Sequence, residues 1–119
     1  MNHIEDAHQA ALIEWADVQA KEIPELGLLL HIPNGGKRNP REAARLKKQG
    51  VRAGVPDLYL PVPRGGRHGL WIELKSPESG RVSDKQRWWI DALTRQGYAA
   101  CVCVGWPQAR DTIIEYLEA

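Results

Sequence analysis

The chain has 119 residues, of which 16 are Lys or Arg and 15 are Asp or Glu, giving a net charge of +1. This length suffices for one hydrophobic core, so a single domain over residues 1–119 is predicted. The hydrophobic share of 43% and the charged share of 26% are typical of globular proteins and exclude disordered and fibrous classes. No apolar stretch approaches the roughly 20 residues that cross a bilayer, and the first residues lack the basic and apolar segments of a secretory signal. We therefore expect a soluble, cytoplasmic protein with no membrane partner.

The charges are distributed unevenly along the chain. Residues 1–30 carry six acids and one base, whereas residues 31–52 carry seven bases and one acid, a net of +6. The remaining residues carry eight of each. A concentrated basic segment is what phosphate binding requires, although a solvated helix face explains the same charges equally well.

Hydrophobic periodicity and turn residues predict eight elements. Apolar residues recur at helical spacing from Ile4 to about Lys21, and Pro24 ends that pattern. The nearly continuous apolar run Leu26–Ile32 predicts a buried strand. The later segments predict a turn at 33–36, a helix between 39 and 50, a hairpin of strands over 58–62 and 70–75, a helix from 83 that ends before 97, a strand over 98–104 and a helix over 108–117. This order predicts an α/β fold with a mixed β-sheet flanked by helices.

The cysteines and histidines predict neither a disulfide nor a zinc site. Cys101 and Cys103 would point to the same side of a strand with Cα atoms roughly 6.6 Å apart, near the upper limit for a disulfide. We expect both thiols to be free and to pack as small apolar side chains. The four histidines show no spacing typical of a pair of zinc ligands.

The strand predicted over 70–75 carries charges that need an explanation. With the two-residue period of a strand, Trp71, Glu73 and Lys75 share one face, and the three aliphatic residues share the other. Buried charges are costly unless they are paired or bind a metal. The alternative is a half-exposed Glu–Lys pair, which is common at sheet edges.

The preceding strand adds a second carboxylate. If the segments 57–62 and 70–75 pair as a hairpin, Asp57 can lie beside Glu73, and two carboxylates this close repel unless a cation lies between them. Oxygen ligands suit Mg²⁺ or Mn²⁺ rather than zinc. Such an ion can bind a phosphodiester oxygen and lower the pKa of a bound water. Lys75 would then orient or deprotonate that water, or stabilise developing negative charge. The pattern indicates a metal-dependent phosphodiesterase.

These residues match the signature of a nuclease superfamily. Pro56-Asp57 followed by Glu73-Leu74-Lys75 resembles the PD-(D/E)XK motif, and more narrowly the chain resembles the VRR-NUC branch of that superfamily. The matching segments, in chain order, are His31–Arg38 (HIPNGGKR), Gly50–Asp57 (GVRAGVPD), Ile72–Lys75 (IELK) and Ser83-x-x-Gln86. The ordered set covers nearly the whole chain and is more specific than the bare motif. It implies a restriction-endonuclease-like α/β core and DNA cleavage that depends on Mg²⁺ or Mn²⁺.

The resemblance also implies roles for individual residues. It implies that Asp57 and Glu73 bind the metal together with the backbone carbonyl of Leu74, and that Lys75 is catalytic. It further implies a supporting glutamine from the helix that follows, a place that Gln86 fits in position and type.

An acidic residue from the first helix is implied as a further member of the site and metal ligand. Glu5 is our choice because it precedes Gln9 by four residues and so shares its helix face, as in the family's pattern. Glu14 is the competitor, although it lies off that face. The alternative explanation of Glu5 is an ordinary acid favoured by the helix dipole.

The basic segment is interpreted as the DNA-binding surface. Backbone amides and cations in a Gly-rich loop, followed by a basic helix, can hold phosphates, although a simple tight turn is the structural alternative. The predicted DNA-binding residues are Asn34, Gly35, Gly36, Lys37, Arg38, Arg41, Arg45 and Lys48. His31 remains open between a functional role and a hydrogen-bonded core histidine. Trp71, Trp88 and Trp89 could stack on bases, but paired indoles on an amphipathic helix more often fill a core or an interface.

The sequence therefore predicts a metal-dependent, structure-selective DNA endonuclease. Small standalone chains that this one resembles are phage or bacterial proteins that act as homodimers on branched DNA such as four-way junctions, which implies the same partners and cellular setting here. Two alternatives remain: a module of the same fold that binds DNA junctions or ends without cutting, and an enzyme acting on RNA or tRNA. No aromatic RNA-binding signature favours the latter.

Overall fold

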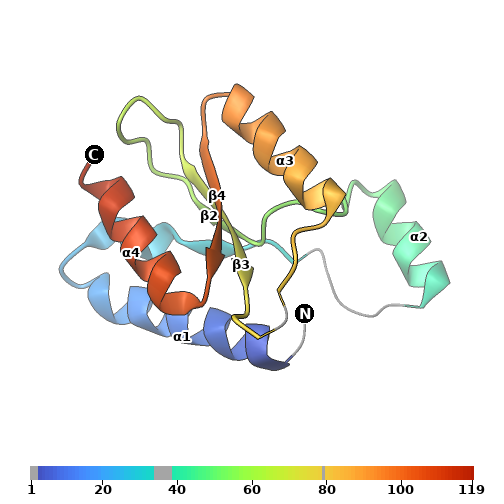
Figure 1. Ribbon diagram of the computed structural model, residues 1–119, viewed down its shortest axis with the longest axis horizontal. Helices are drawn as coiled ribbons and strands as arrows, with labels where there is room; N and C mark the ends of the chain where they lie inside the picture. The colour runs from blue at the N-terminus through green and yellow to red at the C-terminus, as the bar shows by residue number, and fades with distance from the viewer. Residues whose placement is uncertain (1–2, 34–38, 79) are drawn as a thin grey trace.

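The structure, a computed structural model, describes residues 3–33, 39–78 and 80–119. The chain folds into a mixed four-stranded sheet flanked by helices (Figure 1). In chain order the elements are α1 (His3–Gln19), the 3₁₀ helix η1 (Pro24–Leu28), β1 (Leu30–His31), α2 (Pro40–Lys48), β2 (Leu58–Leu60), β3 (Leu70–Lys75), α3 (Asp84–Arg95), β4 (Ala99–Val104) and α4 (Trp106–Leu117). The strands lie in the order β1-β2-β3-β4. The first two pairings are antiparallel and the third is parallel, so the predicted α/β fold with a mixed sheet is confirmed.

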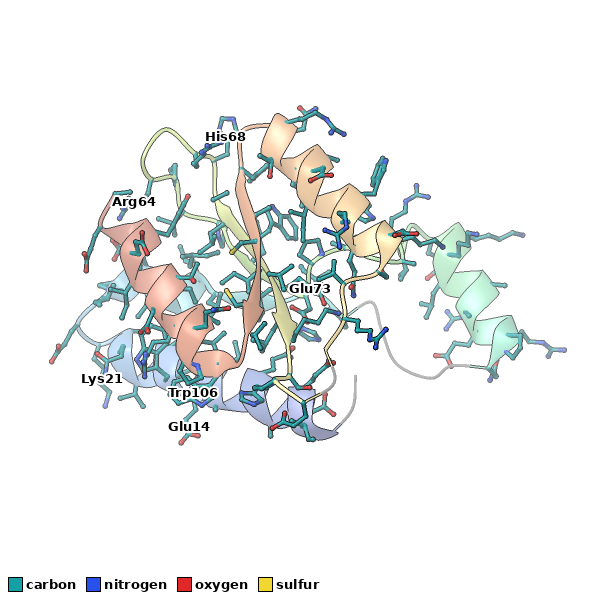
Figure 2. The ribbon with its side chains drawn as sticks, viewed as in Figure 1. Glu14, Lys21, Arg64, His68, Glu73 and Trp106 are labelled. Atoms are coloured by element: carbon teal, nitrogen blue, oxygen red, sulfur yellow. The ribbon has the colours of Figure 1, made fainter. Side chains whose placement is uncertain are left out.

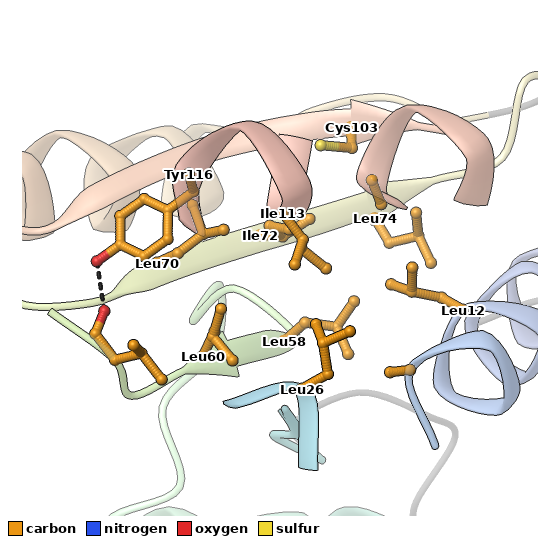
Figure 3. Close-up of a cluster of buried hydrophobic side chains, with 13 residues drawn as sticks. Leu12, Leu26, Leu58, Leu60, Leu70, Ile72, Leu74, Cys103, Ile113 and Tyr116 are labelled. Carbon is orange, nitrogen blue, oxygen red and sulfur yellow. Dashed lines mark hydrogen bonds between the residues drawn. The ribbon is translucent and has the colours of Figure 1, made fainter. Parts of the chain in front are cut away.

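The two faces of β3 meet different surroundings. Leu70, Ile72 and Leu74 are buried on the face that packs against α1 and α4 (Figure 3). Helix α3 packs against β4 on the opposite side of the sheet, as Figure 1 shows. The alternation predicted for this strand is therefore confirmed, with Glu73 and Lys75 on the face that α1 and α4 leave uncovered.

The core is formed by apolar side chains, mostly from both terminal helices and the central strands. Its members are Leu12, Ala16, Leu26, Leu58, Leu60, Val62, Leu70, Ile72, Leu74, Cys103, Ala109, Ile113 and Tyr116. The hydroxyl of Tyr116 donates to the carbonyl of Val62 at 2.6 Å, which satisfies a polar group within this apolar cluster (Figure 3). Cys101 and Cys103 are free thiols, as predicted, with Sγ atoms 4.0 Å apart.

The buried strand predicted over Leu26–Ile32 is wrong. Pro24 stands in the first turn of a 3₁₀ helix that continues to Leu28, and only Leu30–His31 joins the sheet. Hydrogen bonds from Leu26 to Ile23 and from Leu29 to Leu26 close the 3₁₀ turns. A continuous apolar run does not distinguish a strand from a short helix, and here Leu28 and Leu30 are 52% and 40% exposed.

Smaller differences concern element ends and the predicted turn. Helix α4 begins two residues earlier than predicted because Pro107 is accommodated in its first turn. Strand β2 ends at Leu60 because Pro61 cannot donate to a ladder. Of the turn predicted at 33–36, residues 34–36 lie outside the described residues.

Helix α2 stands apart from the rest of the molecule (Figure 1). Its N-cap is Asn39, whose side chain accepts a hydrogen bond from the backbone N–H of Glu42 at 2.8 Å. None of its residues is buried. Over the described ranges, no helix is both long enough and apolar enough to span a membrane.

Leu12 provides a test of the core packing. It is fully buried, so Leu12→Ala should leave a cavity and lower the free energy of unfolding by about 2–5 kcal/mol. Urea unfolding followed by circular dichroism measures this loss. The matched control is Leu28→Ala, at a half-exposed position, which should change the unfolding free energy by roughly 0.5 kcal/mol or less. Equal losses in the two variants would contradict the described core.

Candidate active site

Two carboxylates face each other where β2 begins. The register pairs Leu58 with Ile72, and its continuation by one residue places Asp57 opposite Glu73. Both side chains are almost fully buried, at 6% and 5% exposed. The predicted approach of Asp57 to Glu73 is therefore what the fold produces.

Asp57 accepts three hydrogen bonds, one at its side chain and two at its backbone carbonyl. Its Oδ1 accepts from the backbone N–H of Leu74 at 3.0 Å. Its carbonyl accepts from the N–H of Ile32 and from Nδ1 of His31, both at 2.8 Å. Because a carbonyl can only accept, Nδ1 of His31 carries the hydrogen. His31, whose role the sequence left open, thus makes a hydrogen bond that ties β1 to the backbone of Asp57.

Pro56 leaves the carbonyl of Leu74 without a partner from β2. A strand residue directs its N–H and its carbonyl to the same neighbouring strand, so both groups of Leu74 face the start of β2. Continuing the register by two residues places Pro56 opposite Leu74, and proline has no N–H to donate. The side chain of Asp57 satisfies the N–H of Leu74, and the carbonyl oxygen is left beside the two carboxylates.

The segment before Asp57 is fastened to the start of α3. The indole N–H of Trp89 donates to the carbonyl of Ala53 at 3.1 Å. Gly54 has φ +91°, and a Cβ there would meet backbone atoms of Lys85 at 2.8 Å. Only glycine allows this close approach. Trp89 therefore acts as a structural anchor, whereas Trp71 stacks on Tyr59 with centroids 4.1 Å apart.

Lys75 and Gln86 form a hydrogen-bonded triangle with Glu73. The ammonium of Lys75 lies 3.3 Å from Oε2 of Glu73 and donates to Oε1 of Gln86 at 2.9 Å. Nε2 of Gln86 donates to the same Oε2 of Glu73 at 3.2 Å. Three residues predicted from the sequence are thus brought together, with Lys75 itself only 7% exposed.

Burial dominates the electrostatics of the carboxylate pair. Desolvation raises the pKa of Asp57 from 3.8 to about 6, against the hydrogen bond from Leu74 and the charges of His31 and Lys75, which lower it. Desolvation, followed by the charge of Asp57, raises the pKa of Glu73 from 4.5 to about 7, against the lowering effect of Lys75. One ammonium therefore does not compensate two buried carboxylates.

Glu5 belongs to the same electrostatic cluster. Its charge adds to the raised pKa of Glu73. Glu5 precedes Leu12 and Ala16 by seven and eleven residues, so it shares the helix face that α1 buries. Glu14 instead lines a groove with Asp6 and Asp17 on the flank of α1, and Figure 2 shows it well away from Glu73. Between the two acids considered, the geometry favours Glu5.

The donor set fits a hard divalent cation. Asp57, Glu73 and the Leu74 carbonyl offer oxygen atoms, the ligands that Mg²⁺ and Mn²⁺ prefer. Two mutually repelling buried carboxylates share the single positive charge of Lys75, and a cation would provide the compensation that is missing. Among the described residues, no three His, Cys, Asp or Glu side chains converge as a ready-made site. The cluster is therefore built on a carboxylate pair rather than on three converging acids.

The predicted DNA-binding residues divide into two groups. Arg41, Arg45 and Lys48 are exposed and lie at helical spacing on one face of α2. The five residues at 34–38 (Asn34, Gly35, Gly36, Lys37 and Arg38) lie outside the described residues. The described part of the basic segment is a charged stripe on a projecting helix.

Comparisons with known proteins identify the family of the chain. The family model of the VRR-NUC domain matches residues 4–107. A solved structure described as a VRR_NUC domain protein is 30% identical and superposes with a TM-score of 0.83, and the match covers 99% of this chain and 91% of that chain. No curated protein sequence matches the chain. The fold is therefore a nuclease-like, DNA-acting one, and the chain belongs to the VRR-NUC family.

Proposed function

We propose that this protein is a Mg²⁺- or Mn²⁺-dependent DNA endonuclease that hydrolyses phosphodiester bonds at the Asp57–Glu73–Lys75 cluster. The observation that carries the proposal is the buried carboxylate pair, which one ammonium leaves uncompensated. A fold that retains such a pair at its centre incurs a cost in stability, and a cation-binding role accounts for that cost.

Asp57, Glu73 and the Leu74 carbonyl would hold the metal, with Glu5 in support. Oδ1 of Asp57 and Oε2 of Glu73 already accept hydrogen bonds, so Oδ2 and Oε1 are the oxygens available to a ligand. When bound, the cation supplies positive charge for a phosphate oxygen and a more acidic water.

Lys75 is the residue that we assign to charge stabilisation during hydrolysis. Its contacts with Glu73 and Gln86 occupy two of the three N–H bonds of an ammonium. The third can donate to the attacking water or to a phosphate oxygen as negative charge develops. Gln86 holds the ammonium in place and keeps Glu73 oriented by donating to Oε2.

The basic stripe of α2 would hold the DNA backbone. A chain of 119 residues has few elements left for reading bases, so we expect recognition of the DNA backbone and shape. The family resemblance adds the expectation of a preference for branched DNA such as four-way junctions. A homodimer with two sites related by a two-fold axis suits a substrate that needs paired nicks.

The experiment that tests the proposal compares cleavage of labelled linear duplex, splayed-arm, flap and four-way-junction DNA, and a matched RNA duplex, with Mg²⁺, Mn²⁺ or EDTA. Junction cutting that EDTA stops is the expected result. A gel shift of the junction without cutting in either metal would contradict the proposal and identify a DNA-binding module.

Lys75→Ala should lower the single-turnover cleavage rate by at least about a hundredfold, because it removes a donor aimed at developing charge. Junction affinity in Ca²⁺ and the far-ultraviolet circular dichroism spectrum should change little. The control is Lys21→Ala, an exposed lysine well away from Glu73 in Figure 2, which should cleave at the wild-type rate. Retained cleavage by Lys75→Ala would refute the assigned role.

The raised pKa values predict how pH affects the stability of the metal-free protein. The folded carboxyls titrate at about 6 and about 7, above their ordinary values of 3.8 and 4.5, so the unfolded chain binds fewer protons over that interval. Stability in EDTA should therefore fall from pH 4.5 to pH 8, by an amount on the order of a few kcal/mol.

Thermal unfolding in EDTA at pH 4.5 and pH 8 measures this fall. The double variant with Asp57→Asn and Glu73→Gln should show a flatter profile, because neither new side chain titrates. Mg²⁺ should raise the wild-type Tm more at pH 8 than at pH 4.5, since binding requires deprotonated carboxylates. A wild-type profile identical to that of the double variant would contradict the described burial.

The α2 stripe predicts a salt dependence. Each lost phosphate contact lowers the slope of log K against log salt by about 0.9. A triple variant with Arg41→Gln, Arg45→Gln and Lys48→Gln should therefore lose up to about 2.7 units of slope, measured by fluorescence anisotropy in Ca²⁺. The control pair Lys21→Gln with Arg110→Gln should leave the slope unchanged. An unchanged slope in the triple variant would remove α2 from the interface.

A further inference from the structure

Helix α3 begins with a hydrogen-bonded cap that also contacts the candidate active site. Oγ of Ser83 accepts from the backbone N–H of Gln86 at 3.1 Å. Oε1 of Gln86 accepts in return from the backbone N–H of Ser83 at 2.9 Å, which completes a capping box. The same Oε1 accepts from the Lys75 ammonium, and Nε2 donates to Glu73.

The cap determines which way the Gln86 amide faces. Its oxygen must lie between two donors, the N–H of Ser83 and the ammonium of Lys75. Its NH₂ group then has only one direction left, toward the Glu73 carboxylate. Losing the Oγ contact of Ser83 frees the first turn of α3 and with it the amide that contacts both Lys75 and Glu73.

We infer that Ser83 is a positioning residue of the active site. By capping α3 it fixes Gln86, and through Gln86 it sets where the Lys75 ammonium lies relative to Glu73. The inference rests on the proposed nuclease function for its kinetic consequence, whereas the positioning itself is a property of the protein without DNA.

A comparison within the chain separates this role from ordinary helix capping. Helix α2 has the same kind of N-cap, with Asn39 accepting from the N–H of Glu42. There the residue three places after the cap is an acid, the usual partner in a capping box. At the start of α3 a glutamate would also cap, but it would place a third carboxylate beside Glu73 and offer no donor to it. The choice of Gln86 matches the needs of the site rather than those of the helix.

The test compares Ser83→Ala with Ser83→Thr, which keeps a hydroxyl, and with Asn39→Ala, which removes the cap of α2. Each alanine variant should lower Tm by a few degrees. Only Ser83→Ala should lower the single-turnover cleavage rate at saturating DNA, by about tenfold to a hundredfold, because a small misplacement of a catalytic group is costly. Its junction affinity in Ca²⁺ should stay unchanged, and Ser83→Thr should restore the rate.

A second measurement needs no cleavage. The side-chain amide signals of Gln86, assigned from their absence in Gln86→Glu, should move toward those of a free glutamine in Ser83→Ala and stay in place in Ser83→Thr and Asn39→Ala. Unmoved amide signals in Ser83→Ala, or a rate equal to that of Asn39→Ala, would overturn the inference. If the wild-type protein cut no substrate, the proposed function would fall, and the amide signals alone would decide whether Ser83 positions Gln86.

Discussion

The candidate site depends on two carboxylates that the sheet keeps side by side at buried positions of adjacent chain segments. Desolvation and mutual repulsion both oppose the charged forms of Asp57 and Glu73, as their raised pKa values record. The contacts around them act against this cost: the N–H of Leu74 on one carboxylate, and Lys75 and Gln86 on the other. These contacts fix the carboxylates in place, but one cation for two anions leaves the cluster electrostatically incomplete. That deficit is what makes the arrangement suited to binding a divalent ion rather than to stabilising the fold.

The end of the β2–β3 ladder also contributes to the candidate site, through a backbone carbonyl. A ladder that continued past Leu58 would pair the Leu74 carbonyl with an N–H, and Pro56 prevents this. The lost ladder bond is offset elsewhere, because Leu58, Leu60 and Ile72 are fully buried and hold the two strands together below the site. Glycine at position 54 and the Trp89 contact then fasten the segment before Asp57 to α3. Backbone irregularity at the site is thus confined between a packed core and an anchored helix.

The sequence allowed the sheet and the carboxylate pair to be predicted because both depend on short-range patterns. The two-residue alternation of the strand assigned Glu73 and Lys75 to one face. The predicted hairpin then placed Asp57 beside Glu73. The 3₁₀ helix at Pro24–Leu28 was missed because an apolar run has the same composition in a strand and in a tight helix. The four-residue spacing from Glu5 to Gln9 favoured Glu5 over Glu14, but which part of α1 meets the sheet is a tertiary contact that this spacing does not show. Gln86 both completes the cap of α3 and contacts Lys75 and Glu73. These hydrogen bonds depend on where α3 starts relative to β3, so the sequence motif could be recognised but the hydrogen bonds could not be predicted from it.

The charge distribution along the chain gains a physical meaning from the fold. The total of only +1 arises from an acidic first helix and a basic segment that are kept apart in space. Asp6, Glu14 and Asp17 lie on the flank of α1, while α2 projects from the body (Figure 1). A phosphate backbone is repelled by the first surface and attracted by the second, within the roughly 8–10 Å over which charges act at physiological salt. Under the proposed function, this separation orients DNA before any contact with the buried carboxylates forms. If that function holds, a small protein with few elements for base reading would orient its substrate by charge and use its rigid interior for the chemistry.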